Sequence, residues 1–130
     1  FGAQLAAKRI RFRSNCGRGR FPADPALLRR AVSNFLSNAV RHTPPGGRID
    51  LSISGTPDER TIVAVANTGE PIPPGDLGKV FDRLYRGEYA RSSPGSGLGL
   101  TIAKRIAELH GGTVTIRNLE EGGVVVEMIL

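Results

Sequence analysis

Two helical patterns, each followed by strand-like runs, constrain the fold of this chain more than any other feature. The first helix is expected over residues 25–42, because Asp24 supplies an N-cap and Pro25 fits the first helical position. The second is expected over residues 98–110 and should end at the pair Gly111–Gly112. This order predicts a layer of helices on one face of a mixed sheet.

The strand-like runs are short, and most of them alternate apolar and polar residues. In the first run, Ile10 and Phe12 should share one face, and the stretch "NCGRGRFPAD" after it is expected to form a loop. The run "TIVAVAN" is continuous enough to predict a strand buried on both faces. We expect strands at 9–13, 48–54, 61–67, 113–118 and 124–130, the second pairing with the third and the fourth with the fifth.

Length and charge limit the kind of protein without identifying it. A chain of 130 residues is one domain's worth, and no apolar run is long enough to cross a membrane, so we expect a soluble domain. Because Phe1 stands where an initiator methionine would, a fragment of a longer protein is expected. The lone Cys16 predicts neither a disulfide nor a zinc site and fits a reducing compartment. The net charge of +6 allows nucleic acid, an acidic partner or a polyphosphate as counter-charge.

The first predicted helix carries an apolar stripe and a polar line. Asn34, Asn38 and Arg41 are spaced i, i+4 and i+7, on the side that we expect to lie opposite the stripe. The line is either a solvated face or a site where amide oxygens hold a hydrated Mg²⁺ while Arg41 contacts phosphates. The residues of the stripe are Leu28, Val32, Phe35, Leu36 and Ala39.

A glycine-rich loop leads into the second predicted helix. Gly95, Gly97 and Gly99 let the backbone approach a phosphate at the helix N-terminus, where unpaired N–H groups point outward. A glycine-rich turn without a ligand is the alternative. Leu100 after Gly99 excludes both a Walker loop and a dinucleotide fingerprint. The preceding loop, residues 82–96, has too few apolar residues to bury itself, which indicates a functional lid or disorder.

A third polar stretch, "VANTGEPIP", follows the most apolar strand. Asn67 closes that strand and Gly69 breaks it. The stretch is either an ordinary turn or a pocket that recognises a base.

Taken together, these stretches resemble the catalytic and ATP-binding domain (HATPase_c) of sensor histidine kinases. "NFLSNAVRHTPPGG" resembles the N box of that family, "VANTGEPIP" its first glycine box, "VFDRLYRGEYAR" its F box and "GSGLGL" its second glycine box, all in family order. The resemblance implies that residues 1–130 form one such domain. The implied fold is the Bergerat (GHKL) α/β two-layer sandwich, with a mixed, mainly antiparallel five-stranded sheet and about three helices on one face.

The resemblance also implies a set of residues that contact ATP and Mg²⁺. Asn38 corresponds to the magnesium ligand, His42 to a position against the adenine, and Arg86 to a γ-phosphate contact, so that Asn38 and Arg86 are the expected catalytic residues. The full implied set is Asn34, Asn38, Arg41, His42, Asn67, Gly69, Ile72, Tyr85, Arg86, Gly95, Ser96, Gly97, Leu98, Gly99 and Leu100.

Asn67 is a departure from the family pattern, which usually has aspartate there to accept a hydrogen bond from the adenine amino group. Asparagine keeps the acceptor oxygen but loses the charge, so we expect the adenine contact to be weaker by about 1 kcal/mol. Pro71 stands where glycine is usual. This variant is similar to the heavy-metal sensor branch of the family.

The resemblance implies phosphotransfer rather than hydrolysis, because Asn34 stands where the related ATPases have a glutamate base, and an amide does not take a proton at neutral pH. Neither His42 nor His110 lies in an acceptor motif, so the accepting histidine is expected on a separate dimerisation domain of a homodimeric parent kinase. A response-regulator aspartate would receive the phosphoryl group next. The expected setting is the cytoplasmic side of a membrane-anchored bacterial inner-membrane sensor kinase.

Two alternatives stay open beside the kinase interpretation. One is a degenerate nucleotide-sensing module without phosphotransfer, suggested by Asn67. The other is a basic nucleic-acid-binding domain, supported by the charge alone, so no nucleic-acid partner is expected.

Overall fold

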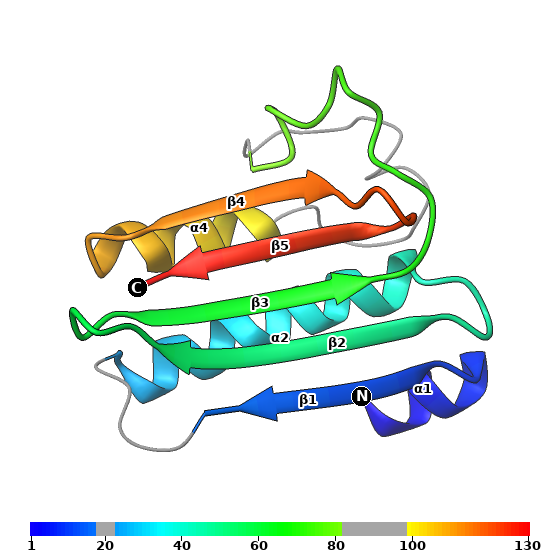
Figure 1. Ribbon diagram of the computed structural model, residues 1–130, viewed down its shortest axis with the longest axis horizontal. Coiled ribbons are helices and arrows are strands. Elements are labelled where there is room, and N and C mark those ends of the chain that lie inside the picture. Colours follow the sequence, from blue (N-terminus) through cyan, green and yellow to red (C-terminus); the bar gives the residue numbers. More distant parts are fainter. Residues whose placement is uncertain (18–22, 82–98) are drawn as a thin grey trace.

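The fold is a five-stranded sheet with helices packed on one face (Figure 1). The computed structural model describes residues 1–17, 23–81 and 99–130. The strand order is β1-β2-β3-β5-β4; β1 and β2 run parallel and every other neighbouring pair is antiparallel, which confirms the predicted sheet. The elements in chain order are α1 (Gly2–Lys8), β1 (Arg11–Cys16), α2 (Pro25–His42), β2 (Arg48–Gly55), β3 (Thr61–Asn67), α4 (Gly99–Leu109), β4 (Thr113–Asn118) and β5 (Val124–Ile129).

Local capping residues set the ends of the two long helices. The carboxylate of Asp24 accepts hydrogen bonds from the N–H groups of Ala26 and Leu27, at 2.9 and 3.0 Å, which confirms the predicted start of α2. At the end of α4, Gly111 has φ +69° and the N–H of Gly112 donates to the carbonyl of Ala107, the bonding pattern of a Schellman motif. Across the described ranges, no helix has both the length and the apolar character that a bilayer crossing requires.

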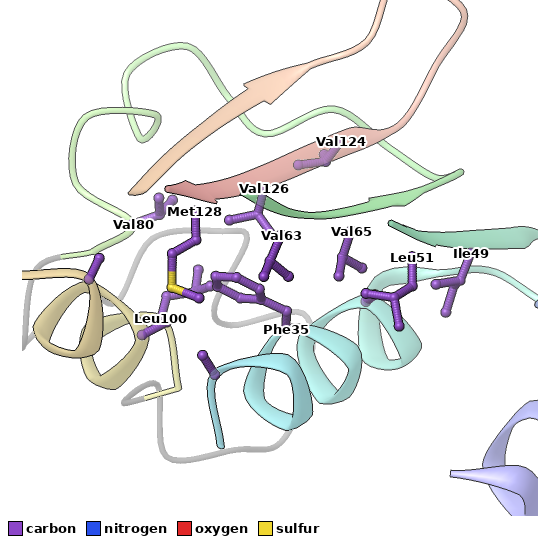
Figure 2. Close-up of a cluster of buried hydrophobic side chains, with 14 of the residues drawn as sticks. Phe35, Ile49, Leu51, Val63, Val65, Val80, Leu100, Val124, Val126 and Met128 are labelled. Atoms are coloured by element: carbon purple, nitrogen blue, oxygen red, sulfur yellow. The ribbon is translucent and has the colours of Figure 1, made fainter. Parts of the chain in front are cut away.

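The hydrophobic core lies between the sheet and helices α2 and α4. Figure 2 shows Phe35 pointing from α2 toward Val63 of β3 and Met128 of β5, and all three side chains are buried. Along β3 the buried positions alternate with half-buried ones such as Ala64. The prediction that β3 is buried on both faces is therefore wrong, because the helices cover only one face of the sheet.

The N-terminal region differs from its prediction. Residues 2–8 form a helix that the sequence pattern did not indicate, and Arg9 ends it in the left-handed conformation, at φ 54°. The first strand therefore starts two residues later than predicted, and it also takes in Asn15 and Cys16, which were expected in a loop. Ile10 is buried but Phe12 is 40% exposed, because β1 is an edge strand whose residues are all exposed.

The two helices connect parallel strands by crossovers of opposite hand. Helix α2 joins β1 to its neighbour β2, and α4 joins β3 to β4 across the intervening β5. β1 and β3 run in opposite directions, yet both crossovers advance in the same direction along the sheet and both helices lie on the same face (Figure 1). The β3-α4-β4 unit has the common right hand, so the β1-α2-β2 unit has the rare left hand.

Candidate functional site

The polar line of α2 borders the core. Asn38 is buried, with an exposed fraction of 7%, and Asn34 and Arg41 are half-buried. The expectation that this line lies opposite the apolar stripe is therefore wrong. Two nitrogens of the line, Nδ2 of Asn34 and Nε of Arg41, are buried and have no hydrogen-bond partner within the described part of the chain. Both nitrogens are therefore available to an acceptor from outside the described residues, as is Nε of Arg60 beside the start of β3.

The C-terminal end of α2 is held by a lysine that is distant in the sequence. Nζ of Lys8 donates to the carbonyl oxygens of Val40 and Thr43, at 2.8 and 3.0 Å, and these oxygens lie where a helix lacks internal partners. Beside this cap lies a pocket of about 330 Å³, lined by Lys8, Arg41, His42, Thr43, Pro44, Glu70, Pro71 and Pro73. The pocket brings the end of α2 together with the segment that follows β3, as expected for one site.

His42 faces this pocket in its neutral form. Burial, followed by the positive charges of Arg41 and Lys8, lowers the pKa of His42 to about 4. An uncharged imidazole ring can lie against an apolar or aromatic ligand without the cost of burying a charge.

The pKa of His42 predicts a loss of stability in mild acid. Because the unfolded chain binds the proton near pH 6.5 and the folded chain only near pH 4, the free energy of unfolding should fall as the pH drops through this window. The full effect is at most about 3 kcal/mol, and less because the ring is partly exposed. Urea unfolding between pH 4 and 7.5 measures it, with His42→Gln as the variant that should lose this part of the pH dependence. An NMR titration in which His42 protonates near pH 6.5 would contradict the prediction.

The segment after β3 lies against the end of α2. Gly69 has φ +146°, and a Cβ atom built on it would lie 2.7 Å from the carbonyl oxygen of His42 and 3.6 Å from Nδ2 of Asn67. Asn67 is buried, and its Nδ2 donates to the carbonyl of Thr68 at 2.9 Å. This bond fixes the amide, and Oδ1 accepts no hydrogen bond from any residue that the structure describes. Asn67 therefore presents its Oδ1 as an acceptor.

Hydrogen bonds to neighbouring strands fasten this segment at both ends. At its start, the N–H of Thr68 donates to the carbonyl of Arg48, and the N–H of Arg48 donates to Oγ1 of Thr68. Further along, the N–H of Ile72 donates to Oδ1 of Asn118 at 2.8 Å, and Nδ2 of Asn118 donates to the carbonyl of Ile72 at 2.9 Å. Ile72 is fully buried.

The N-terminus of α4 lies level with the polar line of α2. The N–H of Asp24, at the start of α2, donates to Nε2 of His110 at the end of α4, over 3.1 Å, and the helices run antiparallel (Figure 1). Because a helix rises 1.5 Å per residue, Gly99 lies about 16 Å back along α4, and an equal step along α2 ends near Asn34. The positive end of the α4 dipole is therefore expected at the level of the line that carries the unpartnered nitrogens.

Several predicted site residues lie outside the described part of the chain. Of the glycine turn only Gly99 and Leu100 are described, and Leu100 is buried. Oγ1 of Thr101 donates to the carbonyl of Phe81 at 3.1 Å, which joins the two ends of the segment between them. The predicted residues that fall outside the described ranges are Tyr85, Arg86, Gly95, Ser96, Gly97 and Leu98.

The sequence analysis missed Lys8 and Asn118. Lys8 reaches α2 from another helix, and nothing in the local pattern indicates such a contact. Asn118 could have been noticed in the sequence, because it ends its predicted strand as Asn67 does. In the structure both residues pair with Val124 of β5.

The sequence matches a known family model over residues 23–130, described as "Histidine kinase-, DNA gyrase B-, and HSP90-like ATPase". Among curated proteins, the signal transduction histidine-protein kinase/phosphatase MprB of Mycolicibacterium vanbaalenii is 43% identical over 100 residues, 77% of this chain and 21% of that protein. Sensor protein CreC of Escherichia coli K12 is 39% identical over 127 residues, 98% of this chain and 27% of that protein. The chain thus spans about a quarter of the curated relatives it matches.

Solved structures share the fold. A mycobacterial sensor histidine kinase MprB structure superposes with a TM-score of 0.82 at 31% identity, covering 99% of this chain and 91% of that one. Full-length ShkA in complex with AMPPNP gives a TM-score of 0.81 at 25% identity, with 98% and 26% covered. Histidine kinase ThkA in complex with the response regulator protein TrrA gives 0.79 at 25% identity, with 100% and 36% covered.

Proposed function

Because the chain belongs to the family of histidine kinase-, DNA gyrase B- and HSP90-like ATPases, we propose that this domain binds Mg-ATP and donates the γ-phosphate to a histidine. The accepting histidine lies on a separate dimerisation domain of the parent kinase, and a response-regulator aspartate receives the phosphoryl group from it. The solved complexes of ShkA with AMPPNP and of ThkA with TrrA support the choice of nucleotide and of partner.

The pair of buried, unpartnered nitrogens on α2 carries this proposal. Nδ2 of Asn34 and Nε of Arg41 are donors, and the oxygens of a triphosphate are acceptors that would satisfy both. Asn38 lies between them on the same line, and its side-chain oxygen would hold Mg²⁺ together with phosphate oxygens. When bound, Mg²⁺ supplies positive charge that neutralises the triphosphate.

The base of the nucleotide fits the other end of the site. Oδ1 of Asn67 is an acceptor that suits the amino group of adenine. The neutral ring of His42 borders the pocket and offers a flat surface for the base. Ile72 is fully buried and anchors the segment after β3 in the core. The amide oxygen keeps the acceptor but lacks the charge of a carboxylate, so the contact should be weaker by about 1 kcal/mol.

The residues of α2 favour transfer over hydrolysis. A hydrolase needs a base close to the γ-phosphate, and the amide of Asn34 takes no proton at neutral pH. The domain therefore contributes positioning and charge, through Asn38, Arg41 and the predicted contact Arg86, while the acceptor histidine comes from elsewhere in the parent protein. We place that parent in the bacterial inner membrane, with this domain on the cytoplasmic side.

Two arginines of the sheet, Arg13 and Arg48, are paired with one carboxylate of the protein, which weighs against a role for them in binding nucleic acid. Nε of Arg13 and Nε of Arg48 contact the carboxylate of Asp50 at 2.8 and 3.1 Å. The hydrogen bond from Arg13 is the main reason that the pKa of Asp50 is lowered.

Calorimetric titration with a non-hydrolysable ATP analogue tests the proposal. We expect saturable binding that becomes about tenfold or more tighter when Mg²⁺ is added, because the metal joins Asn38 to the phosphates. Titration with GTP is the control for base recognition and should give weaker binding. Absence of binding at millimolar nucleotide, with or without Mg²⁺, would contradict the proposal.

A further inference from the structure

The side chain of Asn118 hydrogen-bonds the backbone of the segment that follows β3. It makes two bonds to the same residue, accepting from the N–H of Ile72 at 2.8 Å and donating to its carbonyl at 2.9 Å. The pair satisfies both backbone groups of a residue that is fully buried. A side chain of this shape holds a backbone much as a neighbouring strand would, although Ile72 belongs to no strand.

Asn118 and Asn67 lie in one row across the sheet. Val124 of β5 pairs with Asn67 on one side and with Asn118 on the other. The chain leaves the sheet after Asn67 and returns to the same row at Ile72, where Asn118 receives it. Residues 68–73 therefore form an arch whose first foot stands at the end of β3 and whose second foot, at Ile72, is bound to the end of β4, on the other side of β5.

The first foot of the arch is fixed independently of Asn118. Thr68 exchanges hydrogen bonds with Arg48, and Gly123 packs so closely on this corner that an added Cβ would lie 2.1 Å from the carbonyl oxygen of Asn67. At the second foot the side chain of Ile72 is buried in the core, and Pro71 and Pro73 on either side of it have no N–H to donate. The two bonds with Asn118 therefore fix how the backbone of Ile72 is oriented on that anchor.

We propose that Asn118 is a positioning residue that fixes the arch of residues 68–73 and thereby sets the preference of the site for adenine over other bases. This inference rests on the nucleotide site proposed above. Glu70, Pro71 and Pro73 of the arch line the pocket that His42 borders, so a displaced arch changes the distance between the two walls that would enclose the base. Both hydrogen bonds of the Asn118 side chain go to Ile72 and none, in the described part of the chain, to α2 or α4, so the phosphate end of the site should be unaffected.

The test compares Asn118→Ala with the wild-type chain and with Asn15→Ala, which removes an exposed asparagine from β1. Kd is measured in the presence of Mg²⁺ for ATP, for GTP and for inorganic tripolyphosphate. We expect Asn118→Ala to raise the Kd for ATP about tenfold, through the loss of two hydrogen bonds, and to bring it close to the Kd for GTP. Its Kd for tripolyphosphate should stay within about twofold of the wild-type value. Asn15→Ala should change none of the three.

A second measurement follows the contact without any nucleotide. The amide hydrogen of Ile72 should exchange at least about tenfold faster in Asn118→Ala than in the wild type, because its acceptor is removed. Asn118→Asp keeps that acceptor but cannot donate to the Ile72 carbonyl, so it should protect the amide while still weakening ATP binding; it also serves if the alanine variant does not fold.

Three results would overturn the inference. Unchanged selectivity between ATP and GTP in a folded variant would show that the arch does not set it. Equal losses for ATP and tripolyphosphate would indicate a general structural role. If the wild-type chain bound no ATP while the Ile72 amide behaved as expected, the contact would stand and the nucleotide site, with the selectivity built on it, would fail.

Discussion

Replacing Asn38 by alanine is expected to abolish the effect of Mg²⁺ on nucleotide binding. In the wild type the side-chain oxygen of Asn38 would be the protein ligand that joins the metal to the site, and alanine has no oxygen to offer. We expect the affinity for Mg-ATP to fall about 100-fold, and the ratio of the Kd values without and with Mg²⁺ to approach about one. Calorimetric titration of the variant, with and without Mg²⁺, measures both quantities.

Because Asn38 is buried, the variant must be shown to fold. Loss of a buried polar side chain should lower the free energy of unfolding by about 1–2 kcal/mol, which circular dichroism with urea can measure. Asn38→Asp is the matched control, since it keeps an oxygen ligand of the same reach and should retain the effect of Mg²⁺. If the alanine variant is folded and Mg²⁺ still tightens its binding, Asn38 is not the metal ligand.

Replacing Gly69 by alanine is expected to damage both stability and nucleotide binding. Its φ of +146° is a backbone conformation that only glycine adopts readily, and an added Cβ would lie 2.7 Å from the carbonyl oxygen of His42. Strain and overlap with a backbone atom together should lower the free energy of unfolding by about 2–4 kcal/mol. Relief of the overlap must move the arch away from α2, so the affinity for ATP should fall more than about tenfold at temperatures where the variant is folded.

Substitutions at two other glycines separate backbone strain from steric overlap as causes of the expected loss of stability. Gly46 has φ +79° and no atom near its Cβ position, so Gly46→Ala measures the backbone strain by itself, about 1 kcal/mol. Gly75 has neither a positive φ nor a neighbour within 4 Å, and Gly75→Ala should change stability by less than about 0.5 kcal/mol. Should Gly69→Ala cost no more than Gly46→Ala and leave ATP binding intact, the close approach to His42 would be refuted.

The parts of the fold that the sequence predicted well are those governed by local chemistry. Helix α2 begins at Pro25 and ends at His42 as expected, because its cap residues and its apolar spacing lie within the helix itself. Strand β4 likewise matches its prediction residue for residue. The N-terminus was misread because Arg9, in place of glycine, occupies the left-handed position that ends α1. A helix that ends without glycine gives little warning in the sequence.

The candidate site was predicted less completely, because its contacts join distant residues. The spacing of Asn34, Asn38 and Arg41 was visible, but their burial depends on α4 and the sheet, which no local pattern reports. The expected cost of Asn67 considered only its missing charge. In the structure its Nδ2 donates to the carbonyl of Thr68, a bond that an aspartate could not make, so asparagine has a structural use at this position.

The left-handed β1-α2-β2 crossover has a consequence for the order in which the protein assembles. Two pairs of strands are hairpins, β2 with β3 and β4 with β5. Each hairpin forms by closing a short loop, which costs little conformational entropy. β1 can pair with β2 only after α2 has packed on the sheet, because α2 connects the two strands. This connection is left-handed, which the twist of the strands disfavours. We therefore expect the antiparallel strands and α2 to form the early folding unit and β1 to join last. An edge strand added late should also be the first to detach, so local opening of the native protein should begin at β1 and release the cap that Lys8 places on α2.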